Sequence, residues 1–111
     1  MIRTGIICVL LVALIAPVAF GGGGGNAAAG KDTFLKKCSV CHGKDGMGSA
    51  PMSKVLGVTI PPLSSPDVQK LTDAEMTKVM KEGKGKMKPV ADISSADISN
   101  LIAFTRTLAS K

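Results

Sequence analysis

The chain has 111 residues, three cysteines, a single histidine and neither tryptophan nor tyrosine, and its formal net charge is +6. A leader-like N-terminus inflates the hydrophobic content of 45%, and about eighty residues remain, which is enough for one domain. Export and the scarcity of aromatic side chains for base stacking make nucleic acid a poor partner, despite the basic charge.

The N-terminal residues have the pattern of a targeting segment. Arg3 supplies a short positive start, and an apolar run from Ile6 to Phe20 follows it. That run is shorter than the roughly 20 residues that a membrane-spanning helix needs, which favours a cleaved signal over an anchor. Cys8 lies inside the run, and no cysteine stands at its end, where a lipoprotein would carry one. The sequence therefore predicts an exported, periplasmic protein.

Two triplets offer small residues for cleavage of this leader, Ala19–Gly21 and Ala27–Ala29. Between them, Gly21–Gly25 have no side chains to pack and are expected to form a flexible spacer. We therefore expect residues 1–29 to be signal and spacer, and residues 30–111 to be the domain. An uncleaved leader would tether that domain to the membrane.

The first helix is predicted over residues 27–41. Its alanines favour helix, and Asn26 is suited to cap its start. Gly30 lies inside it, where glycine costs about 1 kcal/mol relative to alanine. Either another backbone approaches closely there, or the helix begins later, at Asp32. The residues that share one face at helical spacing are Phe34, Leu35, Cys38 and Cys41.

The run Cys38–Gly43 has the sequence C-S-V-C-H-G, and C-x-x-C-H is an attachment site for c-type haem. The two thiols add across the two vinyl groups, and the two-residue gap lets both sulfurs reach one edge of the macrocycle. The imidazole of His42 then lies under the iron as the proximal ligand. A thioredoxin-like pair needs strand-rich surroundings, and a zinc site needs a second ligand pair, which this chain lacks. The motif therefore predicts one covalent haem, attached through Cys38 and Cys41.

Residues 43–66 are predicted to be mostly loop, because glycine and proline recur too often for a long element. A ligating histidine usually donates its other ring N–H to a carbonyl or carboxylate. Pro51 is the candidate for a turn that supplies this carbonyl to His42, with a plain turn residue as the equal alternative. Apolar side chains expected against the haem edge are Val55, Leu56, Val58, Ile60 and Leu63.

Two more helices are predicted, one over residues 72–82 and one from Ser94 or Ser95 to about Ala109. Thr72 and Glu75 form a capping-box pattern at the start of the first. Apolar residues recur at helical spacing in both, and no stretch alternates with a period of two. The predicted fold class is therefore all-α, with about three to four helices around one haem.

The glycine- and lysine-rich segment 83–89 lies between these helices and holds one apolar thioether, Met87. A thioether is a soft ligand for haem iron, and Met/His ligation raises the potential. The other methionines are Met1, Met47, Met52, Met76 and Met80. The first lies in the leader, the next two follow the motif too soon to reach the opposite haem face, and the last two lie on a helical core face. Met87 is therefore the candidate distal ligand, and the alternative is a gap-filling methionine in an exposed loop.

These residues resemble the class I cytochromes c, especially the small bacterial single-haem carriers of the cytochrome c6 and c-555 type. The resemblance covers residues 30–111. It rests on Gly30 and Phe34 spaced before the haem motif, on the late glycine-rich loop with its methionine, and on Leu101–Phe104. It implies that the first and last helices cross at Gly30, with Phe34 packed against Phe104.

The resemblance also implies roles for the site residues. Cys38 and Cys41 would be the thioether residues, His42 the proximal ligand and Met87 the distal ligand. The fold would hold one covalent haem c between two axial ligands.

The function implied is periplasmic electron transfer by a monomer that is not an enzyme. Lys84, Lys86 and Lys88 surround the proposed ligand loop, and a basic rim there would steer an acidic redox partner. Membrane contact is expected only through partners or an uncleaved leader. The alternatives are a haem subunit of a larger oxidoreductase, or a small haem peroxidase or gas sensor with a labile sixth ligand. The last two usually need distal acid–base groups, and Arg106 lies on the last helix.

Overall fold

The computed structural model describes residues 24–110, so the leader run, Cys8 and the first cleavage triplet lie outside the described residues. Over residues 24–110 the chain forms helices and no strand. The helices are α1 (Ala27–Lys37), α2 (Ser39–His42), α3 (Ala50–Leu56), α4 (Pro66–Gln69), α5 (Asp73–Glu82), α6 (Ser95–Thr107) and the 3₁₀ turn η2 (Leu108–Ser110). The predicted all-α class is confirmed. None of the described helices is long and apolar enough to cross a membrane.

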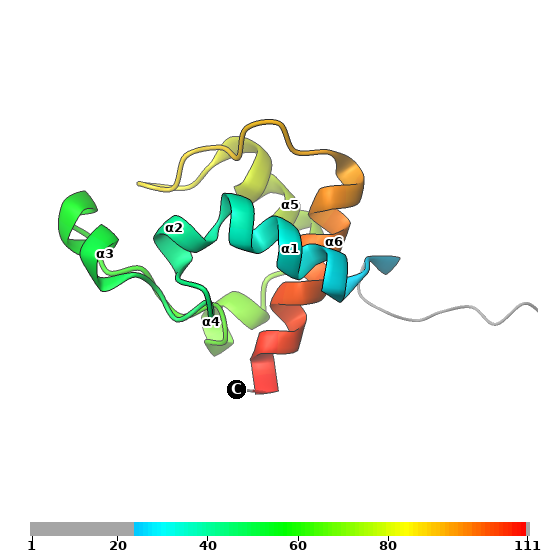
Figure 1. Ribbon diagram of the computed structural model, residues 1–111, viewed down its shortest axis with the longest axis horizontal. Coiled ribbons are helices and arrows are strands. Elements are labelled where there is room, and N and C mark those ends of the chain that lie inside the picture. The colour runs from blue at the N-terminus through cyan, green and yellow to red at the C-terminus, as the bar shows by residue number, and fades with distance from the viewer. Residues whose placement is uncertain (1–23, 111) are drawn as a thin grey trace, which may run out of the picture.

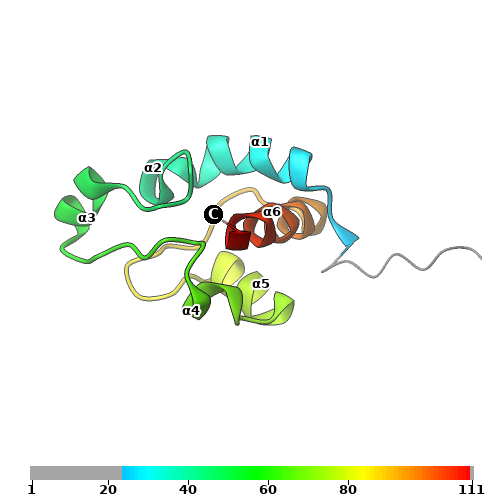
Figure 2. The same ribbon diagram turned by 90° about the horizontal axis from the view of Figure 1, so that it is seen from below.

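Helix α6 runs through the middle of the molecule. Figure 2 shows α1 and α2 on one side of it, and α4 and α5 on the other. Figure 1 shows α1 crossing α6, with α3 at the end of the molecule farthest from the N-terminal segment. The most extensive contact between helices is that of α1 with α6.

The crossing of α1 and α6 is a backbone-to-backbone contact at Gly30. A Cβ on Gly30 would overlap the carbonyl oxygen of Asn100. Close by, the rings of Phe34 and Phe104 lie 5.0 Å apart between centroids, tilted by 49°. Asn26 caps α1 by accepting the N–H of Ala29 at 3.0 Å. The expected crossing is confirmed, and the alternative start of the helix at Asp32 is wrong.

The helix predicted over residues 27–41 is interrupted at Cys38. The Oγ of Ser39 donates to the carbonyl oxygen of Leu35 at 2.6 Å, which is the acceptor that the Ser39 N–H would use in a continuous helix. Cys38 has a φ of −118°, away from the helical value, and the chain resumes as α2. Gly43, with a φ of +78°, ends α2.

Helix α3 lies inside the segment predicted to be mostly loop. Ser49 caps it by accepting the N–H of Met52 at 3.3 Å, and Pro51 occupies its first turn, where a missing N–H costs nothing. Gly57, with a left-handed φ of +69°, ends it. The proline and glycine that led to the prediction of a loop therefore lie in the first turn and at the end of a short helix.

The start of α5 is capped by Thr72 as predicted, with one difference. Thr72 accepts the N–H of Glu75 at 3.1 Å, but the Glu75 carboxylate accepts the Thr72 hydroxyl at 3.2 Å rather than a backbone N–H. The reciprocal capping box forms instead at α6, between Ser94 and Asp97.

Among the residues that the structure describes, two buried clusters make up the core. One joins α1 to α6 and η2, and it consists of Phe34, Leu101, Phe104 and Leu108. The other joins α5 to α6, and it consists of Met76, Ile98 and Ile102. Ile93 and Met80 pack against both.

Arg106 ties α6 to the start of α5. Its guanidinium donates to the carbonyl oxygens of Gln69 at 2.7 Å and Leu71 at 2.6 Å, and pairs with the Asp73 carboxylate at 2.9 Å. These bonds use its planar fork of donors. Arg106 is therefore a structural residue of this face.

Candidate haem-binding site

A cavity of about 970 Å³ opens between α1 and α2 on one side and α5 with its following loop on the other. All four residues that the sequence analysis assigned to the haem line it, namely Cys38, Cys41, His42 and Met87. Most of the apolar side chains predicted for the haem edge line it as well, namely Leu56, Val58, Ile60 and Leu63. Val55 does not line the cavity, and this residue is 75% exposed.

The two cysteines of the motif lie at the break between α1 and α2. The N–H groups of Cys41 and His42 both donate to the carbonyl oxygen of Cys38, at 3.2 and 3.0 Å, so one tight turn holds the three residues together. Both cysteines are free thiols. Burial raises the pKa of the Cys38 thiol to about 11, against a smaller opposing effect of the Lys37 charge. Two free thiols on one turn at a cavity wall are the arrangement that attachment to two vinyl groups requires.

His42 presents a neutral imidazole to this cavity. Burial lowers its pKa below the ordinary value, so the ring keeps a lone pair for a metal at neutral pH. Its Nδ1 is buried and has no hydrogen-bond partner among the described residues. The expected bond to a carbonyl at Pro51 is therefore wrong, because Pro51 lies within α3. A half-buried imidazole whose buried Nδ1 has no polar partner fits a residue whose orientation is fixed by a ligand.

The segment after the motif folds back onto it. The Gly48 N–H donates to the carbonyl oxygen of His42 at 2.7 Å, and the Ser49 N–H donates to that of Cys41 at 2.9 Å. These two bonds hold the α2 turn rigidly in place. They satisfy the C-terminal carbonyls of a helix only four residues long.

Met87 reaches the cavity from a tight turn. Lys84 and Met87 exchange two backbone hydrogen bonds of 2.9 Å each, and Gly85 between them takes a left-handed φ of +58°. Figure 2 shows this segment, after α5, on the side of the molecule opposite α2. Met87 is half-buried, whereas Lys86 and Lys88 beside it are exposed.

Met87 is one of several thioethers on the cavity wall. Met52, Met76 and Met80 line the same cavity. Met76 is buried in the core and Met80 packs against it, in agreement with the packing role predicted for both. Met52 lies on α3, the segment that follows the motif.

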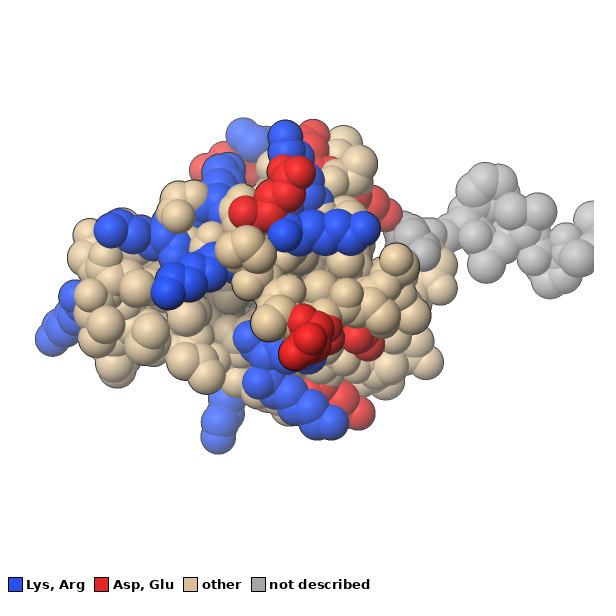
Figure 3. All heavy atoms as spheres, turned by 90° about the horizontal axis from the view of Figure 1, so that it is seen from above, with Lys and Arg blue, Asp and Glu red and all other residues tan. Residues whose placement is uncertain are grey.

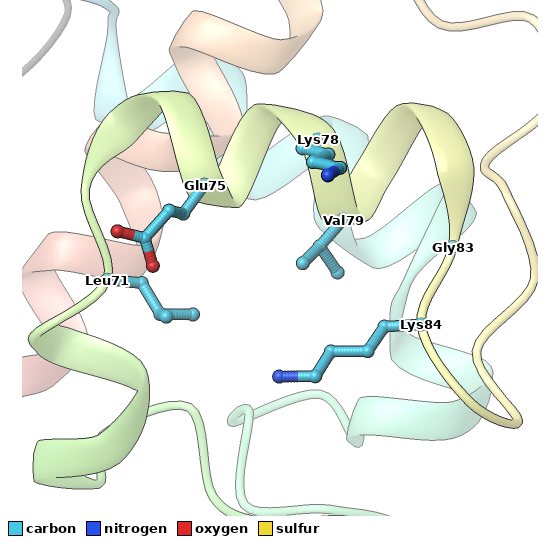
Figure 4. A pocket seen from close by; sticks show the side chains of 6 residues that line it. All are labelled: Leu71, Glu75, Lys78, Val79, Gly83 and Lys84. Carbon is cyan, nitrogen blue, oxygen red and sulfur yellow. The ribbon is translucent and has the colours of Figure 1, made fainter.

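A smaller hollow of about 250 Å³ borders the cavity beside α5 (Figure 4). Leu71, Val79 and Lys84 belong to both. Charged side chains of Glu75 and Lys78 complete its lining, and it contains no residue of the C-x-x-C-H motif. It adds no ligand to the site.

Lys37 is a residue of this site that sequence reasoning missed. It lines the cavity, and its Nζ donates to the carbonyl oxygens of Ala91 at 2.9 Å and Asp92 at 3.1 Å. Its place directly before Cys38 is visible in the sequence. A contact with residues more than fifty positions later is not, because it depends on the tertiary fold.

Comparisons with known proteins identify the family of this chain. Residues 25–104 match the protein family described as cytochrome c oxidase, cbb3-type, subunit III. Cytochrome c-554(547) of Halothiobacillus neapolitanus is 32% identical over 90 residues, which cover 76% of this chain and 98% of that protein. The fold is similar to that of the KustC0563 c-type cytochrome, with a TM-score of 0.59 at 23% identity, covering 71% of this chain and 95% of that structure.

The residues present fit the cofactor of this family, a covalently bound c-type haem. Free thiols at C-x-x-C-H spacing, a half-buried neutral imidazole and a large apolar cavity meet at one place. The haem supplies an iron that takes up and releases one electron. The chain belongs to the cytochrome c family and is a small monohaem c-type cytochrome, an electron-transfer protein.

Proposed function

We propose that this protein is an exported single-electron carrier with its haem attached through Cys38 and Cys41 and ligated by His42 and Met87. The observation that carries the proposal is that these four residues line one cavity, with Met87 on a separate, tightly turned loop. A thioether and a neutral imidazole on opposite sides would fill both axial positions. An iron with both positions filled changes its surroundings little between the two redox states, which suits a carrier rather than an enzyme.

The proposal places the leader before the packed part of the chain. The Asn26 N–H donates to the Oδ1 of Asn100 at 2.8 Å, and a Cβ on Gly25 would overlap the backbone of Ser99. Cleavage after Ala29 would remove these contacts. We therefore favour cleavage before Gly24 and a haem domain that includes the whole of α1. Proteins of this family are typically exported, which agrees with the leader-like sequence.

The basic rim is the proposed docking site for acidic redox proteins. Lys84, Lys86 and Lys88 border the cavity next to Met87 and their side chains are exposed. Figure 3 shows Lys and Arg side chains about a hollow on one face, and an end of the molecule without Asp or Glu on that face. Positive charge around the cavity mouth speeds the encounter with a negative partner more than it tightens the complex.

A second candidate is a haem subunit of a larger oxidoreductase. The matching family is named for an oxidase subunit. Val40 on α2 and Val55 on α3 are 66% and 75% exposed, and both helices lie at one end of the molecule (Figure 1). Gentle extraction of the exported protein, followed by mass measurement of the native assembly, separates the two. A monomer supports the carrier, and a stable complex with an oxidoreductase supports the subunit.

The peroxidase or sensor alternative has less support. Arg106 does not line the cavity, and its guanidinium is already used by three hydrogen bonds next to α5. His42 is the only histidine of the chain and is assigned to the proximal side. A distal acid–base pair would have to come from other residue types.

The visible spectrum of the exported holoprotein tests the ligand assignment. We expect a low-spin reduced spectrum, a weak far-red thioether-to-iron band in the oxidised protein, and no binding of carbon monoxide. Met87→Ala should abolish the band and admit carbon monoxide. Met52→Ala and Met80→Ala are the matched controls, because both side chains line the same cavity. Loss of the band in either control, with Met87→Ala unchanged, would transfer the role to that methionine.

A further inference from the structure

We propose that Lys37 is a positioning residue that clamps the segment between Met87 and α6 against α1. The clamp would keep the loop closed over the distal side of the cavity. The inference rests on the proposed ligation by Met87 for its functional meaning, whereas the clamp itself is a property of the loop.

Lys37 makes two converging contacts with this segment. It is the last residue of α1, and its Nζ donates to the carbonyl oxygens of Ala91 and Asp92 at 2.9 and 3.1 Å. An ammonium group carries three donors on a flexible stem, which suits two neighbouring carbonyls. Asp92 has a left-handed φ of +53°, the only such value at a non-glycine position over residues 24–110. A turn of this kind is uncommon for a residue with a side chain and needs support from its surroundings.

The segment has few other anchors. Over residues 88–93, the described hydrogen bonds to the rest of the protein are the two from Lys37 and one from the Val90 N–H to the carbonyl oxygen of Met80 at 2.9 Å. Within the described part of the chain, the hydrogen bonds of the turn from Lys84 to Met87 are the two that these residues exchange with each other. Ile93 adds apolar packing against both core clusters. Lys37 is therefore the link between this segment and the helix that leads into the haem motif.

The neighbouring Lys36 shows that the role is specific to one position. Lys36 lies in the same last turn of α1 and is exposed as well. It makes no hydrogen bond or ion pair within the described part of the chain. Lys36 therefore offers a control with the same charge, the same helix and the same turn.

The test compares Lys37→Met, Lys37→Arg and Lys36→Met in the ferric holoprotein. Lys37→Met keeps the length of the side chain and removes its donors. We expect amide exchange at Val90 to become about three- to tenfold faster in Lys37→Met, as for the loss of one typical hydrogen bond. In Lys37→Met, the far-red band should disappear at a lower denaturant concentration than the helical dichroism. Lys37→Arg should restore both, and Lys36→Met should match the wild type.

The outcomes separate this inference from the proposed ligation. If the wild type shows no far-red band, ligation by Met87 fails, and exchange at Val90 still reports on the clamp. If the band is present but Lys37→Met behaves like Lys36→Met in both measurements, the clamp is overturned. If Lys37→Met loses the band and the helical dichroism together, Lys37 has only a general stabilising role, and the proposal fails as well.

Discussion

Gly30 of α1 and Asn100 of α6 touch through their backbones, because a Cβ on Gly30 would overlap the Asn100 carbonyl oxygen. This contact sets the spacing of the two helices that hold Phe34 against Phe104. The haem motif follows directly on α1, so the crossing also fixes where the cysteines face the cavity.

Gly30→Ala is expected to destabilise the protein by about 2 kcal/mol or more, because the methyl group meets a backbone that cannot rotate away. The better helix propensity of alanine, about 1 kcal/mol, offsets only part of this loss. Denaturant unfolding of the holoprotein measures the change. Lys31→Ala, the exposed next position, is the control and should be nearly neutral. Equal stability of the two variants would show that the helices can separate at no cost.

The features that the sequence predicted depend on local or covalent chemistry. Asn26 and Thr72 cap helices through neighbours three residues away, and the C-x-x-C-H spacing is dictated by the haem that it must hold. The break at Cys38 and the helix α3 were missed. Each depends on one serine, and a serine side chain can either bond a carbonyl within a helix or cap the start of one. Ser39 takes a carbonyl inside a helix, whereas Ser49 starts one.

The long-range part of the site could not be derived in the same way. Lys37 resembles Lys36 in sequence, and only the folded chain distinguishes them. Met87 was singled out by its place between two helices, although Met52 and Met80 line the cavity too. The packing of the whole fold decides which of these thioethers reaches the iron, and no local sequence pattern encodes that packing.

The mature protein is expected to retain Asn26. Loss of this cap would cost about 1 kcal/mol, and loss of its bond to Asn100 would loosen the start of α1. The intact mass of the exported holoprotein gives the cleavage point, and a chain that begins at Gly30 should unfold at a lower temperature. An intact mass that corresponds to a chain beginning at Gly30 would contradict the prediction.

Asp97 is expected to contribute stability that depends on pH. The Ser94 backbone N–H, and then the Ser94 hydroxyl, hold the pKa of this carboxyl below its ordinary range, with help from the Lys37 charge. A lowered pKa means that the contribution is complete above the ordinary value, about 4, and is lost as the pH falls through the lowered value. Asp97→Asn should therefore have a lower Tm than the wild type at pH 7, and the difference should shrink in acid.

Asp32→Asn is the control for this titration. Asp32 is exposed on α1 and makes no hydrogen bond or ion pair within residues 24–110. Its variant should have a Tm close to that of the wild type at pH 7. A difference between Asp97→Asn and the wild type that stays constant from pH 7 into acid would show that the loss at Asp97 is not electrostatic.

The basic rim is expected to govern the rates of electron exchange with charged reagents. The double variant Lys84→Gln/Lys86→Gln should react several-fold more slowly with ferricyanide at low ionic strength and faster with a cationic cobalt complex, because steering follows the sign of the local field. Both effects should fade as salt screens the charges. Lys31→Gln/Lys36→Gln removes the same charge from α1 and should change the rates less. Equal changes in the two variants would mean that only the net charge matters.

Without haem, the chain is expected to be largely unfolded. Over residues 24–110, seven buried hydrophobic side chains form two clusters beside a cavity of about 970 Å³, so the protein core alone is thin for a domain of this size. The double variant Cys38→Ser/Cys41→Ser cannot attach haem. It should give poorly dispersed amide resonances and little helical dichroism.

A second measurement of the same prediction uses Cys41→Ser alone. In a folded apo-protein, burial would hold the pKa of Cys38 above its ordinary value and make its alkylation slow at neutral pH. Alkylation at the rate of an unfolded peptide would support the prediction, and slow alkylation with dispersed resonances would show that the fold precedes the haem.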